Sequence, residues 1–209
     1  MKSITVICDF YLPGVKGGGP IVSISNLVAM LAKDFEVIVI TRGRDAGDAK
    51  RYDNVEHDVI FEFEGYKIFY VSSLLGLIKS LKFSNSHFLY LNSFFSVFSL
   101  VYMLASVFTK ARRIISPRGE LGDGALAIKA FKKRVFISVY RILRIHRSAV
   151  FIASSPLEEN DIFRKLNIRA LVLENIPSQS FVSRRALKKK SGTVRFIYIS
   201  RITRKKNLH

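Results

Sequence analysis

Tryptophan is absent from the 209 residues, and cysteine occurs once, at Cys8. A single cysteine excludes an intramolecular disulfide, so the fold depends on its apolar core, and a reducing compartment suits such a chain. Cys8 ends a short apolar run at residues 4–8, where its expected role is that of a small buried side chain. This run is shorter than the roughly 7–15 apolar residues of a signal peptide. These absences favour a cytoplasmic protein.

Acidic residues are scarce in the second half of the chain. Residues 1–109 contain 10 basic and 10 acidic side chains, whereas residues 110–209 contain 24 and 6, which places the whole net charge of +18 there. Such uneven charge predicts a polyanionic partner: membrane phospholipid, a phosphorylated acceptor or nucleic acid. No recognisable nucleic-acid motif accompanies the basic residues, so we expect no nucleic acid to bind.

Charge is also missing from residues 88–108, a run of 21 residues that is followed by three cations at 110–113. The run is long enough to cross a bilayer and has a positive flank. It also contains an Asn-Ser pair at 92–93, which is typical of a strand end followed by a helix cap. A transmembrane helix therefore remains an alternative to the favoured interpretation, which is a buried strand at 88–91 and a helix at 94–109.

Elsewhere, short apolar runs alternate with amphipathic stretches. The pattern predicts a hairpin at 59–63 and 66–71, strands at 3–8, 35–40, 88–91, 113–115, 149–153 and 171–173, and helices at 20–33, 73–82, 94–109, 125–147 and 156–166. Strands that alternate with helices imply an α/β, Rossmann-like, mostly parallel sheet with helices on both faces. We assign residues 1–176 to this domain. A polar and basic linker is expected at 177–193, and residues 194–209 are expected to be the truncated start of a C-terminal, donor-binding domain that opens with a new strand at 194–200.

A glycine-rich segment, KGGGP at 16–20, lies between the first strand and the first helix. Gly18 and Gly19 allow close approach of a ligand to the backbone, and the helix N-terminus favours negative charge. The segment matches neither the phosphate loop with its Gly-Lys-Ser/Thr nor the dinucleotide pattern G-x-G-x-x-G. It is therefore either a site for a phosphate or sugar, or a tight strand-to-helix turn.

Two polar segments follow predicted strand ends, where ligands bind in parallel sheets. The segment IISPRGE at 114–120 presents Arg118, which suits a phosphate or acidic acceptor, and Glu120, which suits a sugar hydroxyl. A surface turn with a salt bridge is the alternative. In SSPLEE at 154–159, Ser155 and Glu158 occupy the N-cap and third positions of a capping box, which explains most of this motif. Glu158 is also a candidate to face the cleft.

Basic residues gather in two further places. Within the predicted helix 125–147, a cluster alternates with apolar residues and suits either an anionic membrane surface or a solvated helix face; it comprises Lys129, Lys132, Lys133 and Arg134. Near the end of the chain, Arg201 and Lys206 follow the strand predicted from 194. They are candidates to bind a pyrophosphate leaving group, and a basic tail is the alternative.

Taken in order, these segments resemble the family-4 (group 1) glycosyltransferases of the GT-B fold, especially those of bacterial surface-polysaccharide pathways. The segments that carry the resemblance are YLPGVKGGG at 11–19, FLYLNSFF at 88–95, ISPRG at 115–119, SSPLEE at 154–159, LENIP at 173–177 and the stretch 200–208.

The resemblance implies a fold, an activity and a set of roles. Gly18 and Gly19 would lie beside the donor phosphates, and Arg201 and Lys206 would stabilise the departing nucleoside diphosphate in place of a metal. The N-terminal domain would hold the acceptor, which makes Arg118, Glu120 and Glu158 acceptor-side candidates. The implied reaction is retaining transfer of a sugar from a nucleotide-sugar to a polysaccharide or lipid-linked acceptor. It needs no cofactor, and it takes place in the cytoplasm, peripherally at the inner face of the plasma membrane.

The sequence also departs from the family pattern. Arg118 stands where related sequences often have His, and no glycine follows Asn175. The family's Glu-x7-Glu motif belongs downstream of His209, so the catalytic residues are unknown and we expect the chain to be truncated. The alternative function is a non-catalytic α/β domain that binds a phosphorylated or anionic ligand at the membrane surface.

Overall fold

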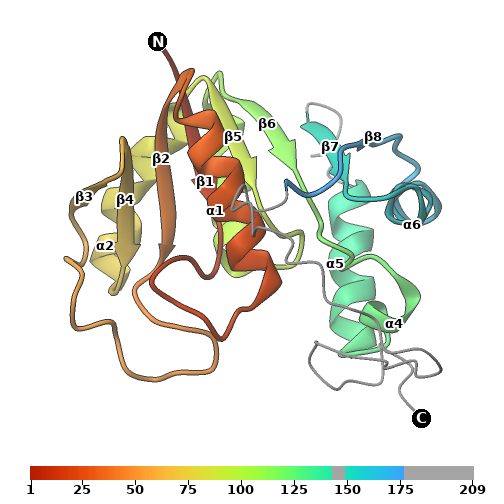
Figure 1. The fold of residues 1–209 in the computed structure, drawn as a ribbon. Helices are drawn as coiled ribbons and strands as arrows, with labels where there is room; N and C mark the ends of the chain where they lie inside the picture. The colour runs from red at the N-terminus through yellow and green to blue at the C-terminus, as the bar shows by residue number, and fades with distance from the viewer. Residues whose placement is uncertain (143–148, 177–209) are drawn as a thin grey trace, which may run out of the picture. The chain divides into compact units, whose positions relative to one another are not determined.

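The computed structural model describes residues 1–142 and 149–176, and this part of the chain forms an eight-stranded sheet. The strands lie in the order β3-β4-β2-β1-β5-β6-β7-β8 (Figure 1). Only the β3–β4 hairpin is antiparallel among these pairs. The strands are β1 (Lys2–Ile7), β2 (Phe35–Arg42), β3 (Ile60–Phe63), β4 (Tyr66–Val71), β5 (Phe88–Leu91), β6 (Arg112–Ile115), β7 (Ala149–Ala153) and β8 (Leu171–Val172).

Helices cover both faces of this sheet, because alternate residues of each strand point to opposite sides. On one face lies α1 (Gly19–Leu31) (Figure 1). Its buried side chains belong to the same core cluster as Val6 and Val39. On the other face, the strand residues Ile7 and Ile40 share a second cluster with three helices. These are α3 (Val97–Ala105), α5 (Ala130–Ile142) and α6 (Pro156–Leu166). The predicted α/β fold with its hairpin is confirmed.

Shorter elements complete the description. They are α2 (Leu74–Ser80), α4 (Asp123–Leu126) and two 3-10 helices, η1 (Leu81–Asn85) and η2 (Ser106–Phe108).

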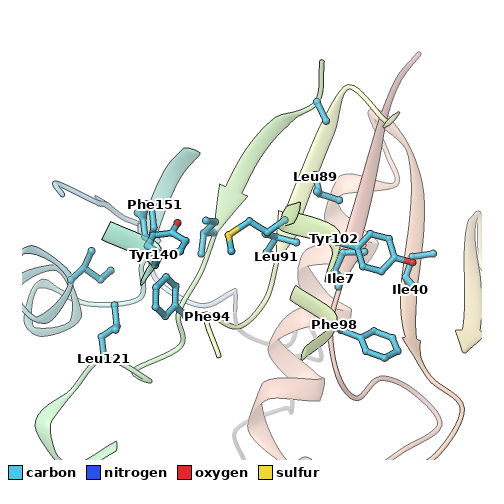
Figure 2. Packing of buried hydrophobic residues seen from close by; sticks show 14 of the residues in the cluster. Ile7, Ile40, Leu89, Leu91, Phe94, Phe98, Tyr102, Leu121, Tyr140 and Phe151 are labelled. Atoms are coloured by element: carbon cyan, nitrogen blue, oxygen red, sulfur yellow. The ribbon is translucent and has the colours of Figure 1, made fainter. Parts of the chain in front are cut away.

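Aromatic side chains fix α5 to the sheet (Figure 2). The ring of Phe94, in the turn after β5, lies 4.8 Å from that of Tyr140 and 5.4 Å from that of Phe136, both in edge-to-face contacts. Phe151 of β7 completes the group. Each such pair adds roughly 0.5–1.5 kcal/mol beyond its buried area, so the position of α5 is well determined.

The strand order reverses between β1 and β5, since β1 pairs with β2 on one side and with β5 on the other. In doubly wound sheets the crevice outside the carboxyl ends of the strands at such a switch point is where ligands bind. The loops that follow β1, β5 and β6 are therefore the expected place for a ligand site.

The transmembrane alternative for residues 88–108 is wrong. The segment divides into β5 and α3, and no helix in the described ranges is long and apolar enough to cross a membrane. The turn between them exists because the Glu120 carboxylate accepts hydrogen bonds from the amides of Phe94 and Phe95, at 2.6 and 3.0 Å. Ser96 then caps α3, which begins three residues later than the helix predicted from position 94.

The continuous helix predicted over 125–147 is also wrong. It is interrupted between α4 and α5, where Lys129 has a φ of 56°. The two helices make different tertiary contacts. Asp123 of α4 is paired with Lys165 of α6 at 2.7 Å, while α5 packs against Phe94. The predicted continuation through 143–147, the linker at 177–193 and the second domain from 194 lie outside the described residues.

Candidate functional site

Arg118 is the centre of the site at the carboxyl ends of the strands. Its Nε donates to Oδ1 of Asn92 at 2.6 Å, and one Nη lies 3.4 Å from the hydroxyl of Tyr90. Its other Nη donates to the side-chain oxygen of Asn175. These partners belong to or follow β5 and β8, and Arg118 itself follows β6, so the fold brings together residues that are far apart in the sequence.

The backbone at Arg118 is also unusual, since its φ of 56° lies in the left-handed region. A non-glycine residue keeps such a conformation, which costs of order 1–3 kcal/mol, where its surroundings determine it strongly. The half-buried guanidinium is thus held in place before any ligand arrives. A planar group with several donors, fixed in this way, suits bidentate binding of a phosphate or carboxylate.

Glu158 anchors the loop that carries Arg118. Its Oε1 accepts from the amide of Gly119 at 2.6 Å, and its Oε2 accepts from the amide and hydroxyl of Ser154 at 2.7 and 2.6 Å. Glu158 is 5% exposed. The predicted cap is present, because the hydroxyl of Ser155 accepts from the amide of Glu158. Glu158 therefore positions two loops instead of presenting a free carboxylate to the cleft.

The carboxylate of Glu120 also accepts hydrogen bonds from within the protein. Besides the amides of Phe94 and Phe95, it accepts a hydrogen bond of 2.7 Å from the hydroxyl of Ser93. The structure thus gives Glu120 the task of shaping the turn after β5, next to Asn92.

The glycine loop before α1 has one occupied end and one open end. The carboxylate of Asp45 accepts from the amides of Val15 and Lys16 at 2.8 and 3.0 Å. Burial raises the pKa of Asp45, but the hydrogen bonds from backbone amides lower it by a larger amount, so the pKa lies below its usual value. At the other end, Gly18 has a φ of 68°, and a side chain added at the exposed Gly19 would meet open space.

A groove of about 430 Å³ lies at the carboxyl ends of β2 and β4. Arg42, Arg44 and Arg51 line it together with apolar side chains that include Leu74 and Phe98, and none of its lining residues is acidic. The guanidinium of Arg42 lies 4.7 Å above the ring of Phe98, and its Nε is 3.0 Å from Oδ1 of Asp9. The groove combines cations with an apolar wall.

Four site residues are not predicted from the sequence: Asp9, Arg42, Asn92 and Asn175. Asp9, Arg42 and Asn92 each lie within two residues of the end of a strand, which is the signal that could have identified them. A larger groove, of about 570 Å³, surrounds Phe35 and Gly65 at the opposite edge of the sheet. Because parallel sheets bind ligands at their carboxyl edge, we assign no function to it.

The remaining candidates fall into three groups. Burial raises the pKa of Cys8 to about 12, which makes it an inert core thiol. Lys129, Lys132 and Arg134 are exposed, whereas Lys133 donates to the carbonyl of Ala125 at 2.7 Å and lies above the ring of Phe95. Arg201 and Lys206 lie outside the described residues.

No protein-family model matches the chain, and no curated protein matches its sequence. Two solved structures of sucrose-phosphate synthase from Thermosynechococcus elongatus are similar in fold. One has a TM-score of 0.50 at 10% identity, with 86% of this chain and 91% of that one covered. The other has a TM-score of 0.53 at 13% identity, with 83% and 47% covered.

Sucrose-phosphate synthase is a GT-B glycosyltransferase. The described fold is therefore GT-B-like. At these identities the likeness establishes the fold alone. The present chain spans about half the length of the longer of the two structures.

Proposed function

We propose that this chain is the acceptor-side lobe of a nucleotide-sugar-dependent glycosyltransferase of family 4. The observation that carries the proposal is the arginine held by Tyr90, Asn92 and Asn175 at the switch point of a GT-B-like fold. Arg118 would bind an anionic group of the donor or acceptor, and its fixed geometry would avoid an ordering cost during the reaction.

The donor would lie against the open end of the glycine loop. Gly19 and the N-terminus of α1 offer unhindered backbone to a phosphate, and Arg201 and Lys206 would stabilise the departing nucleoside diphosphate. On this proposal the cations replace a metal ion, no cofactor is required and transfer retains the anomeric configuration. The residues that carry out the chemistry are not assigned.

The acceptor would be lipid-linked or a cell-surface polysaccharide. The arginine groove supports the lipid-linked form, because three guanidinium groups beside Leu74 and Phe98 match a phosphate attached to an apolar chain. Such an acceptor would place the enzyme peripherally at the inner face of the plasma membrane.

Transfer of a labelled sugar tests the proposal. The longest product of the gene is incubated with a panel of labelled nucleotide-sugars and lipid-linked acceptors from a membrane extract, and label in the lipid or polysaccharide fraction is expected. Arg118→Gln should lower transfer at least tenfold. Arg112→Gln, which removes an exposed arginine from the first position of β6, the strand that precedes Arg118, should leave transfer unchanged.

Two results would contradict the proposal. Absence of transfer from every donor, with a thermal shift by anionic ligands retained, would assign the chain to the non-catalytic alternative. Equal loss of transfer in Arg118→Gln and Arg112→Gln would show that Arg118 has no specific role in binding the donor or acceptor.

A further inference from the structure

Helix α5 has two apolar faces, although one would suffice to pack it against the sheet. The inner face consists of Phe136, Ile137 and Tyr140, which join the core cluster. Tyr140 is 2% exposed. This face accounts for the attachment of α5 to the protein.

The outer face is the unexplained one. Phe131 is 80% exposed and Ile142 is 77% exposed, and between them Val135 and Val139 are about half exposed. At 3.6 residues per turn these four side chains share an arc of about 80°, on the side of the helix away from Tyr140, and extend over about 16 Å. An exposed apolar stripe of this kind marks an interaction surface.

Cations flank the stripe on both sides. Lys132 borders one edge, Arg134 and Arg141 border the other, and all three are exposed. No acidic residue occurs between Asp123 and Glu158 in the sequence. A groove of about 530 Å³ runs along the second edge, and its lining includes Arg134 and Arg141. The one carboxylate in this lining, Asp123, is already paired with Lys165. The outer face is therefore apolar along its centre and positive along its margins.

We propose that this outer face is a docking surface for an anionic lipid bilayer. Helix α5 lies in the plane of the interface with Phe131 and Ile142 at the boundary of the acyl chains, while Lys132, Arg134 and Arg141 contact headgroup phosphates. Lys133 takes no part, since it is bound to Ala125. The inference goes beyond the proposed function and is tested without any sugar.

The charge pattern favours a bilayer over the other possible occupants. In a symmetric pairing of two α5 helices, positive margins would face positive margins, which is unfavourable. Nucleic acid would leave the apolar centre of the stripe without a partner. An anionic bilayer satisfies both the centre and the margins.

The absence of tryptophan permits a direct measurement. Phe131→Trp introduces a single reporter on the stripe, and Leu75→Trp introduces one at an exposed apolar position of α2 as the matched control. With vesicles of equal parts phosphatidylglycerol and phosphatidylcholine, the emission of the first should shift to the blue and that of the second should not. Vesicles of phosphatidylcholine alone should shift neither.

Co-sedimentation with the same vesicles measures the contributions. Removing the stripe should lower the partition coefficient at least tenfold, and removing its cations should lower it by about a hundredfold. Each variant has a control with the same number of substitutions at exposed positions outside α5. The control should change the partition coefficient by less than threefold. The stripe variant is Phe131→Gln, Val139→Gln and Ile142→Gln, and its control is Met30→Gln, Leu75→Gln and Ile78→Gln; the cation variant is Lys132→Gln, Arg134→Gln and Arg141→Gln, and its control is Lys33→Gln, Lys79→Gln and Lys110→Gln.

Circular dichroism checks that each variant is folded. If the stripe variant does not fold, the cation variant tests the docking surface by itself. Equal losses in the variants and their controls would overturn the inference. So would equal binding to neutral and anionic vesicles, or a change of oligomeric state in the stripe variant with lipid binding intact. Because none of these measurements involves transfer, their failure leaves the proposed function standing.

Discussion

At the scale of single residues, three carboxylates organise the carboxyl edge of the sheet; Asp45 and Glu158 are buried and Glu120 is half-buried. Asp45, Glu120 and Glu158 each accept hydrogen bonds from backbone amides of distant loops. Such an acceptor replaces several water molecules at once, and its removal leaves buried donors without partners. These three carboxylates thus hold the loops of the site in position, which leaves the binding of anions to the arginines.

Glu158→Ala tests this interpretation for the loop that carries Arg118. We expect a loss of about 3 kcal/mol in the free energy of unfolding, because the amides of Gly119 and Ser154 lose their partner. Glu159→Ala, which removes a neighbouring carboxylate paired with Arg169, should cost less than about 1 kcal/mol. Urea denaturation of both variants makes the comparison, and equal losses would contradict the anchoring role.

Asp45 gives a prediction about pH. Its folded-state pKa lies below the unfolded value near 3.9, so its stabilising contribution is present above that value and is lost as the pH falls through the folded-state pKa. Asp45→Ala should therefore cost about 2 kcal/mol at pH 7, with the difference from the unmodified chain shrinking below about pH 4. Denaturation across this pH range is the measurement.

The matched control for this prediction is Asp48→Ala, in the same loop. Asp48 pairs with the exposed Lys16, a kind of ion pair that contributes at most about 1 kcal/mol. A cost at Asp45 that does not change with pH would show that its carboxylate charge is not what the loop requires.

The sequence predicted some of these residue-level features and not others. The capping role of Ser155 and Glu158 was predictable because cap, proline and glutamate are adjacent in the chain. The partners of Glu120 were not, since Phe94 lies 26 residues away and no local pattern records that contact. The left-handed backbone of Arg118 was equally hidden, because arginine is rare in that conformation.

At the scale of elements, the loop between β1 and α1 contains two glycines, Gly14 and Gly19, that have different functions. A side chain at Gly14 would lie 2.4 Å from the hydroxyl of Tyr52 and 2.9 Å from the carbonyl of Tyr11, whereas at Gly19 it would meet nothing. Gly14 is thus required by packing. Gly19 is free to serve a ligand.

Gly14→Ala should destabilise the protein by about 1–3 kcal/mol through overpacking. Gly19→Ala should leave stability unchanged or raise it by up to about 1 kcal/mol, because alanine favours the helix. If donor phosphate approaches the backbone at Gly19, the second variant should also lose about tenfold in nucleotide-sugar affinity. Thermal denaturation and calorimetric titration separate the two effects. Unchanged affinity in Gly19→Ala would remove the donor from this end of the loop.

Helices and strands with a regular spacing of apolar residues were predictable from the sequence, whereas the break between α4 and α5 was not. The strands from β1 to β7 are short apolar runs bounded by polar residues, so their positions follow from the pattern. The break before α5 separates a helix whose Asp123 pairs with Lys165 from one whose Tyr140 packs on Phe94, and neither contact is visible in the local pattern. The pattern also gave α5 one basic face, whereas the structure divides its apolar residues between core and solvent.

At the scale of the whole molecule, topology and charge place different tasks in different regions. The handedness of strand–helix–strand units requires the helices that follow β1 and β5 to lie on opposite faces, which creates the switch point where Arg118 is found. The net charge of +18 lies in the second half of the sequence, which includes α5. A chain of this kind is expected to bind its ligands at the sheet edge and a bilayer through α5.

A shortened chain tests whether these tasks are separable. Residues Met1–Ser178 form one compact unit that includes every described strand, the Arg118 site and α5. A protein ending at Ser178 should therefore fold by itself, unfold in one cooperative transition, and bind anionic vesicles through Phe131 and its neighbours. It lacks Arg201 and Lys206, so its affinity for nucleotide-sugars should fall at least tenfold. Undiminished affinity would mean that the donor is held by Arg118 and the glycine loop without those two cations, and that the diphosphate role proposed for them has to be given up.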